Sequence, residues 1–235
     1  MENRLKKTVD PDNQSCDGLI PGNPFLFFTP NPFLRMQYDP DQVYSPEADT
    51  LLLLNAARAE ARPDDCILEV GTGSGLISAE MARITRVVAT DINPHAVTCT
   101  GRAGIEVVRT DLFAGIRGPF DLILFNPPYL PTQPEERMDD WLEYALDGGE
   151  SGRAVIERFA RSVGDVLAPG GRVLLLISSL TGLSEVQQLF AGRAYSVEIA
   201  IQQDLEDEVL YVLKIFRNDQ GFHPGITCAS GGRQR

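Results

Sequence analysis

The tetrapeptide Asn126-Pro127-Pro128-Tyr129 has the residue types of a site for a flat amide or amino group. It follows Asp121 and the apolar run 122–125, which is typical of a buried parallel strand reaching its carboxyl end. Ligands of open α/β sheets collect at that edge. Two prolines remove two backbone donors and fix φ near about −65°, so the corner is stiff and rich in acceptors. The alternative is a Pro-Pro turn that only closes a strand.

A glycine turn, Gly71-Thr72-Gly73-Ser74-Gly75, links the apolar strand 67–70 to a predicted helix. Glycines allow positive φ and a close approach of a ligand to the backbone. Position 76 is Leu, so the dinucleotide pattern G-x-G-x-x-G is not formed. Glu69 lies two residues before the turn, where its charge repels a pyrophosphate and attracts an ammonium group. We therefore predict a zwitterionic ligand, against the alternative of a structural turn.

Acidic residues also end the next two predicted strands. Asp91 stands 20 residues after Gly71, where a carboxylate can accept hydrogen bonds from both hydroxyls of a ribose. A role in capping the helix that begins at Asn93-Pro94 is the alternative, and both can hold. Asp111-Leu112 can take an amino hydrogen of an adenine and cover one of its faces, although a plain turn at a strand end explains the pair as well.

Strand and helix patterns alternate along the chain and must position these residues. The expected strands are 66–70, 87–90, 105–109, 122–125, 173–178, 196–202 and 209–216, and the expected helices are 46–62, from 76, from 94, 152–167 and 183–190. Such alternation predicts an α/β fold whose sheet is mainly parallel and has helices on both faces. The short link 204–208 predicts an antiparallel hairpin, so the seven-stranded sheet ends in an antiparallel strand.

The first helix has a clear predicted start. Ser45 is expected to be its N-cap, Pro46 its first residue, and Glu47 and Asp49 to lie in its first turn. We expect the helix to run to about Arg62, just before Pro63.

Composition divides the chain into a domain and two flanking segments. We expect an irregular N-terminal extension over residues 1–41, a folded domain over 42–216 and a disordered tail over 217–235. The four cysteines form no close pair and only two histidines are present, which argues against a zinc site and a disulfide framework and favours a reducing compartment. No apolar run is long enough to span a bilayer, and no secretory signal is recognisable, so we expect a cytoplasmic protein.

The charge of the predicted domain bears on its partners. Residues 44–216 hold 14 Lys and Arg against 26 Asp and Glu, which equals the formal charge of −12 of the whole chain. Nucleic-acid binding usually leaves a basic footprint, so this acidity disfavours a DNA or RNA partner.

Acids and glycines at successive strand ends, together with the opening tetrapeptide, resemble class I methyltransferases that use S-adenosylmethionine. The resemblance covers roughly residues 42–216. It narrows to the HemK-type release-factor glutamine methyltransferases, and within them to the archaeal and eukaryotic branch, on three stretches: Tyr44–Leu53, Phe125–Thr132, and Gly148-Gly149 with Gly152-Arg153. One departure is visible, because the branch usually reads Ala-Glu-Asp-Thr where this chain has Glu47-Ala48-Asp49-Thr50.

The resemblance implies an activity and a set of site residues. The expected residues around S-adenosylmethionine are Thr50, Glu69, Gly71, Gly73, Asp91, Asp111, Leu112 and Asn126. The expected catalytic residues are Asn126, Pro127 and Tyr129, and the expected acceptor-binding residues are these three together with Pro128. No metal is expected. The implied acceptor is the glutamine of the Gly-Gly-Gln loop of a class I translation release factor, and a small zinc-ribbon protein often accompanies this branch as an activator. The alternatives are an adenine amino group of DNA, presented as a flipped base, or a protein lysine.

Overall fold

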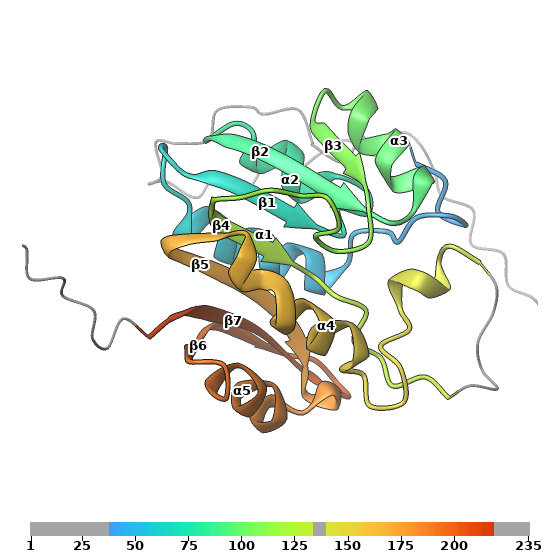
Figure 1. Cartoon of the computed structure of the whole chain (residues 1–235). Helices are drawn as coiled ribbons and strands as arrows, with labels where there is room; N and C mark the ends of the chain where they lie inside the picture. The colour runs from blue at the N-terminus through green and yellow to red at the C-terminus, as the bar shows by residue number, and fades with distance from the viewer. Residues whose placement is uncertain (1–37, 134–139, 219–235) are drawn as a thin grey trace, which may run out of the picture. The chain divides into compact units, whose positions relative to one another are not determined.

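The computed structural model describes residues 38–133 and 140–218. They build a seven-stranded sheet with the strand order β3-β2-β1-β4-β5-β7-β6 (Figure 1). The strands are β1 (Cys66–Val70), β2 (Arg86–Asp91), β3 (Glu106–Arg109), β4 (Phe120–Phe125), β5 (Leu167–Ser178), β6 (Tyr195–Asp204) and β7 (Val209–Arg217). The α/β fold predicted from the alternating pattern is confirmed.

One strand runs against the others. The pairs among β1 to β5 are parallel, whereas β7 is antiparallel to both β5 and β6. The predicted hairpin of β6 and β7 and its antiparallel C-terminal strand are thus confirmed. In space β7 lies between β5 and β6, so the last of the described strands is the second from the edge of the sheet.

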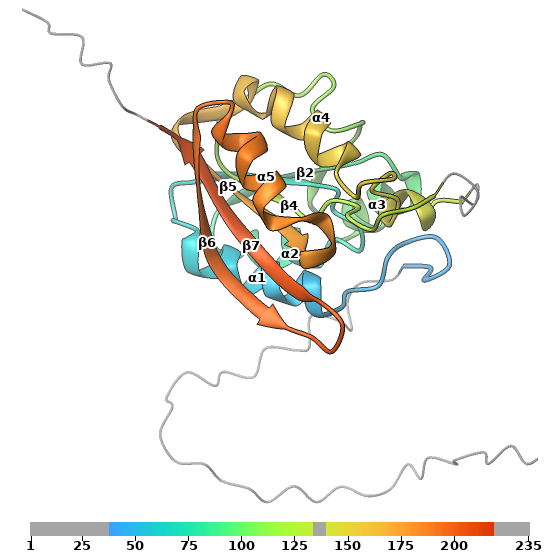
Figure 2. The ribbon, with the colours of Figure 1, turned by 90° about the horizontal axis from the view of Figure 1, so that it is seen from below.

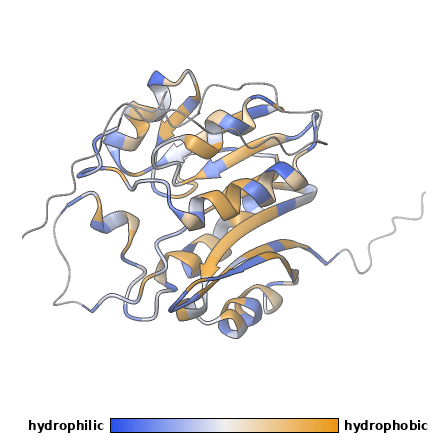
Figure 3. Ribbon diagram, turned by 180° about the vertical axis from the view of Figure 1, so that it is seen from behind, coloured by the Kyte–Doolittle hydropathy of each residue, from blue (hydrophilic) through white to orange (hydrophobic). Residues whose placement is uncertain are grey.

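Helices cover both faces of the sheet. They are α1 (Ala48–Glu60), α2 (Leu76–Met81), α3 (Pro94–Arg102), α4 (Ala154–Ser162) and α5 (Leu183–Ala191), with single 3₁₀ turns at 143–145, 163–165 and 179–181. One apolar cluster joins α1 and α2 to the sheet and a second joins α4 and α5 to it. Figure 2 shows α1 and α4 on opposite sides of the strands. In Figure 3 the orange of hydrophobic residues is concentrated on the strands in the middle of the sheet.

The apolar run of β4 shows how the sequence produces these layers. Side chains alternate across a strand, so Leu122 and Leu124 face the α1 cluster while Ile123 and Phe125 face the α4 cluster. All four are nearly inaccessible to solvent. Burying each such side chain contributes about 1.5–3 kcal/mol, so β4 is fixed from both faces right up to the tetrapeptide that follows it.

The predicted start of the first helix is wrong by two residues. The helix begins at Ala48 with Glu47 as its N-cap, and no side chain caps it from that position. Instead Asp49 bonds within the first turn, its Oδ1 accepting from the backbone N of Thr50 at 2.6 Å. The helix ends at Glu60, because the residue that precedes a proline is disfavoured in helical conformation and position 63 is Pro.

The boundary between α4 and β5 also differs from the prediction. The helix predicted over 152–167 ends at Ser162 and is followed by one 3₁₀ turn, and β5 already begins at Leu167. Leu167 pairs with Phe120, and the register then shifts where Gly170 adopts a φ of 72°. A strand interrupted by Pro169-Gly170-Gly171 has no continuous apolar pattern, so the sequence concealed its first residues.

The predicted N-terminal extension, except residues 38–41, and the predicted tail beyond Asn218 lie outside the described residues. Within the described ranges, none of the helices has the length and apolar character needed to cross a membrane.

A buried ion pair ties the sheet to α1 at the end opposite to the tetrapeptide. Arg172 of β5 is only 4% exposed and its Nη2 lies 2.7 Å from Oδ2 of Asp65. Arg172 also donates to the backbone oxygens of Asp121 and Glu60. Burial raises the pKa of Asp65, but hydrogen bonds from Arg172 and from the backbone of Arg62 outweigh it and lower the pKa overall.

We predict that Arg172→Met lowers the free energy of unfolding by about 3–5 kcal/mol, because it leaves the Asp65 carboxylate buried without its partner. Urea denaturation of the purified chain measures this change. Arg86→Met is the matched control, since the Arg86–Glu106 pair is largely exposed and is expected to contribute less than about 1 kcal/mol. Equal losses in the two variants would contradict the assignment.

Candidate active site

The carboxyl ends of β1, β2 and β4 open into a cavity of about 320 Å³. Its position follows from the parallel register, in which Val70 at the end of β1 pairs with both Thr90 and Phe125. All residues predicted for the ligand and the acceptor line this cavity: Thr50, Glu69, Gly71, Gly73, Asp91, Asp111, Leu112, Asn126, Pro127, Pro128 and Tyr129. The structure therefore brings the whole predicted set together.

The glycine turn after β1 follows the cavity wall with its backbone. The backbone N of Gly71 donates to the carbonyl of Thr90 at 2.8 Å, which fixes the turn against β2. Gly71 and Gly73 have φ values of 69° and 52°, in the left-handed region that favours glycine. A Cβ at Gly73 would meet no atom within 4 Å, so the turn leaves open space beside the backbone for a ligand.

Glu69 is buried behind this turn and is 3% exposed. Its Oε2 accepts hydrogen bonds from Thr72 Oγ1 at 2.9 Å and from Ser78 Oγ. Burial raises the pKa of Glu69 to about 7, although the two hydroxyl groups oppose the shift; the charge of Asp91 adds to it. The carboxyl group can thus change its charge near neutral pH.

Asp91 ends β2 and holds the glycine turn in place. Its Oδ2 accepts from the backbone N of Gly73 and its Oδ1 from the backbone N of Asn93, each at 2.9 Å. Burial raises the pKa of Asp91, and these backbone donors limit the rise. The N-cap of α3 is Asn93, which accepts from His95 N, so the capping role considered for Asp91 belongs to its neighbour. Each carboxylate oxygen has two lone pairs, so both retain capacity for a ligand.

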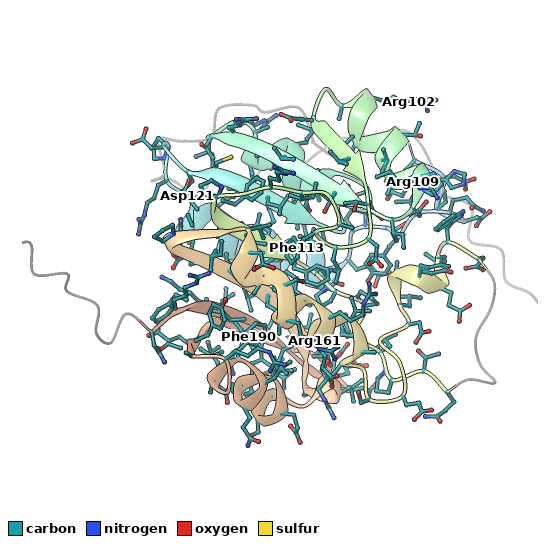
Figure 4. The ribbon with its side chains drawn as sticks, viewed as in Figure 1. Arg102, Arg109, Phe113, Asp121, Arg161 and Phe190 are labelled. Atoms are coloured by element: carbon teal, nitrogen blue, oxygen red, sulfur yellow. The ribbon has the colours of Figure 1, made fainter. Side chains whose placement is uncertain are left out.

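Asp111 and Leu112 follow β3 at the far side of the cavity. Arg158 of α4 lies with its Nη2 2.5 Å from Asp111 Oδ2, and this pair is about half-exposed. Leu112 has a φ of 48°, an uncommon value for a residue with a branched side chain. Next to it Phe113 points into the core, 5.2 Å from the ring of Phe159 (Figure 4). The packed phenylalanine anchors the turn and places Leu112 at the cavity.

The corner at Asn126 contains a hydrogen-bonding contact that the sequence did not reveal. Asn126 Nδ2 donates to Asp49 Oδ2 of α1 at 2.9 Å, and the hydroxyl of Tyr129 donates to the same oxygen at 3.4 Å. Asn126 Oδ1 is buried and has no hydrogen-bond partner within the described structure. A buried acceptor without a partner costs about 1–3 kcal/mol. This atom therefore marks the place where a donor from a ligand fits.

Two tyrosines stand beside Asp49. Burial, followed by the negative charge of Asp49, raises the pKa of both Tyr44 and Tyr129 well above the ordinary value. The two hydroxyl groups therefore remain neutral and act as hydrogen-bond donors at physiological pH.

Glycines 148, 149 and 152 hold the loop that follows Asn126. Gly148 N donates to Leu130 O at 2.9 Å, and Thr132 N donates to Gly149 O at 3.0 Å. A Cβ at Gly152 would lie 2.4 Å from the carbonyl oxygen of Tyr129. The glycine stretch on which part of the family resemblance rests thus allows two backbone segments to touch.

Several cavity residues were not predicted. Trp141, Tyr144, Val155 and Arg158 line it from the segment after residue 140, and Tyr44 and Asp49 from the start of α1. The rings of Trp141 and Tyr144 are 5.3 Å apart, and the guanidinium of Arg109, labelled in Figure 4, lies over Trp141. Tyr44 and Asp49 lie in the stretch Tyr44–Leu53 that resembles the family, so the sequence could have indicated them. Nothing in the sequence around Trp141 and Tyr144 indicated a place at the cavity.

The donor and acceptor set fits a small zwitterion carrying a ribose and an adenine. Carboxyl groups stand at the ends of three successive strands, and the turn between the first and second exposes backbone without Cβ atoms. In the described part of the chain no three or more His, Cys, Asp or Glu side chains group in a way that could hold a metal ion.

Comparison with known proteins identifies the family. Residues 44–140 match the family described as methyltransferase small domain. A putative protein N5-glutamine methyltransferase of Methanocaldococcus jannaschii is 37% identical over 192 residues, which are 78% of this chain and 96% of that protein. The chain belongs to the HemK-type glutamine methyltransferases. Human methyltransferase HEMK2 is 35% identical over 193 residues, 75% of this chain and 90% of the human one.

A solved structure supports the same assignment of this HemK-type chain. The chain of the E. cuniculi Mtq2–Trm112 complex, described as responsible for the methylation of the eRF1 translation termination factor, has a TM-score of 0.64 and 29% identity. The alignment covers 75% of this chain and 99% of that one. The predicted family, its archaeal and eukaryotic branch and its methyltransferase fold are confirmed.

We predict that Glu69 makes the stability of the ligand-free methyltransferase fall as pH rises. The folded pKa of about 7 lies above the ordinary value of 4.5, so the folded state holds a proton that the unfolded state has released between these values. The protonated Glu69 therefore contributes its full share to the free energy of unfolding below pH 4.5. As the pH rises from 4.5 to about 7, this contribution falls by roughly 3 kcal/mol.

Denaturant unfolding at a series of pH values between 5 and 8 measures this slope. Glu69→Gln keeps the shape and an acceptor oxygen, and we expect the decline to be shallower in this variant. Glu106→Gln, an exposed replacement on β3, is the control and should leave the slope unchanged. A wild-type slope that persists in Glu69→Gln would refute the assignment.

Proposed function

We propose that the chain transfers a methyl group from S-adenosylmethionine to the side-chain amide nitrogen of a protein glutamine, in the Gly-Gly-Gln loop of a class I release factor. The observation that carries this proposal is Oδ1 of Asn126, a buried acceptor beside the backbone corner of Pro127 and Pro128 for which the described residues supply no hydrogen-bond partner. The names of the M. jannaschii relative and of the Mtq2–Trm112 complex support the choice of a glutamine and of a termination factor.

The cavity divides among the parts of the cofactor as the sequence resemblance implies. Glu69 and the turn of Gly71 and Gly73 hold the amino-acid end, and Asp91 accepts from the ribose hydroxyls. Asp111 and Leu112 hold the adenine, with Arg158 fixing the carboxylate of Asp111. Thr50 and Asn126 complete the wall next to the reacting end. When bound, the cofactor supplies an electrophilic methyl group on a sulfonium centre.

The acceptor amide needs positioning above all. An amide nitrogen is a poor nucleophile because its lone pair is delocalised. Asn126 Oδ1 and the carbonyl of Pro127 accept its two N–H groups and direct its lone pair to the methyl group, while the ring of Tyr129 packs on the amide plane. Well-oriented groups reach effective molarities of roughly 10⁵ M or more. The same two oxygens stabilise the positive charge that grows on the nitrogen.

The partners follow from the same proposal. The substrate is a release factor, and a small zinc-ribbon protein serves as activator, as the family resemblance implies. The solved E. cuniculi structure is that of a complex of Mtq2 with a second protein, Trm112, which supports a partner protein. An excess of acids in residues 44–216 is compatible with protein partners and unfavourable for nucleic acid. We place the catalytic domain in residues 42–216 and the enzyme in the cytoplasm, where translation ends.

For the cofactor, we predict that Asp91→Ala weakens the binding of S-adenosylmethionine at least tenfold, because it removes the ribose acceptor and the contact to the N–H of Gly73. Isothermal titration calorimetry of the purified chain gives the dissociation constant. Asp204→Asn, in the β6–β7 hairpin and away from the cavity, is the control with unchanged affinity. An Asp91→Ala dissociation constant within twofold of wild type would remove Asp91 from the cofactor site.

For the acceptor, we predict that Asn126→Ala folds and binds the cofactor but transfers methyl groups at less than about 1% of the wild-type rate. Mass spectrometry of release factor coexpressed with either form locates the added methyl group. The wild-type chain should modify the glutamine of the Gly-Gly-Gln loop. Labelled transfer to duplex DNA or to lysine, with an unmodified glutamine, would overturn the proposal.

A further inference from the structure

We propose that Asp49 is a positioning residue that fixes the orientation of the Asn126 amide and so decides which of its atoms faces the acceptor. The inference rests on the proposed function, because it assigns a role within the same reaction. It draws on the hydrogen bond between Asp49 of α1 and Asn126 after β4, which are 77 positions apart in the sequence.

The orientation of Asn126 is set by the chemistry of its partner. An ionised carboxylate only accepts hydrogen bonds. Asp49 Oδ2 lies 2.9 Å from Nδ2 of Asn126, so the opposite orientation of the amide would set two acceptors against each other without a proton between them. The pairing with Asp49 therefore directs Nδ2 towards α1 and leaves Oδ1 for the acceptor nitrogen.

Asp49 is itself held so that it can impose this direction. It is 4% exposed, and its Oδ1 accepts from Thr50 N at 2.6 Å and from Thr50 Oγ1 at 3.2 Å. Its Oδ2 accepts from Asn126 and from the hydroxyl of Tyr129. Both oxygens are thus occupied by donors of fixed position, and the carboxylate cannot turn without losing them.

Most buried polar atoms of folded proteins have a hydrogen-bond partner, so a buried atom without one calls for an explanation. Here the hydrogen bonds satisfy Asp49 and the Nδ2 of Asn126 but leave Asn126 Oδ1 buried without a partner in the described structure. The explanation offered is that Asn126 Oδ1, a buried acceptor held in a fixed position, receives its hydrogen bond from a donor of the substrate. The same cluster holds Tyr129, which is expected to contact the acceptor plane, so one carboxylate orients two acceptor-binding residues.

The replacement Asp49→Asn tests the direction of this hydrogen bond. Oδ1 of the new amide must still accept from the backbone N of Thr50, so its Nδ2 turns towards Asn126. Asn126 then offers its oxygen to that donor and presents its own NH₂ to the acceptor, which places donor against donor. We expect kcat to fall at least 100-fold while the dissociation constant of S-adenosylmethionine changes less than threefold.

A second replacement should restore the polarity. In Asp49→Asn with Asn126→Asp, the carboxylate at 126 accepts from the amide at 49 with one oxygen and offers the other to the acceptor nitrogen. We expect this double variant to be at least tenfold more active than Asp49→Asn alone, whereas Asn126→Asp alone sets two carboxylates together and stays poorly active. Asp65→Asn is the matched control, since it also replaces a buried, hydrogen-bonded aspartate but lies far from the cavity, and it should retain the wild-type kcat.

A fall in kcat smaller than tenfold in Asp49→Asn, or a double variant no more active than the single one, would overturn the inference.

A second measurement tests Asp49 without an acceptor. The kinetic experiment presupposes a wild-type chain that methylates release factor; if the chain does not, the proposed function fails, but the role of Asp49 can still be tested. Nuclear magnetic resonance of the ¹⁵N-labelled chain reports the side-chain NH₂ of Asn126, assigned by its absence in Asn126→Asp. We expect one of its protons to exchange with water at least tenfold more slowly than a free amide in wild type, and to lose this protection in Asp49→Asn. Unprotected protons in wild type would contradict the inference whatever the acceptor is.

Discussion

The parallel register at the centre of the sheet is the constraint on which the site depends. Val70 pairs with Thr90 on one side and with Phe125 on the other, so β1, β2 and β4 end at one level. The residues that follow these ends, from the glycine turn to Asn126, therefore meet around one cavity. Because β4 is packed by apolar clusters on both faces, neither the register nor the position of Asn126 can shift without exposing core side chains.

Two segments outside the sheet complete the cavity. The start of α1 contributes Asp49 and Thr50, and the residues from Trp141 to Arg158 contribute an aromatic pair and a guanidinium group. Both segments are attached to the loop after β4, the first through the carboxylate of Asp49 and the second through backbone hydrogen bonds made possible by Gly148 and Gly152. The acceptor corner is thus held from both sides by contacts between residues distant in sequence.

Local signals predicted most of the fold and the outline of the site. Apolar runs, turn glycines and acids at strand ends are patterns of a few neighbouring residues and can be recognised in the sequence. The sheet and the gathering of Glu69, Asp91 and Asn126 at one edge of it were therefore predictable. Long-range contacts were not. The first residues of β5 exist because Leu167 pairs with Phe120, which is 47 positions away in the sequence. The bond between Asp49 and Asn126 has no local signature at all.

In the proposed reaction, the corner of Asn126 and Pro127 holds the two N–H groups of a glutamine amide. A crystal structure of the chain with S-adenosylhomocysteine and a peptide carrying Gly-Gly-Gln tests it most directly. We expect the amide nitrogen to lie within about 2.7–3.2 Å of both Asn126 Oδ1 and the Pro127 carbonyl oxygen. A glutamine bound elsewhere, or one whose nitrogen contacts neither oxygen, would contradict it.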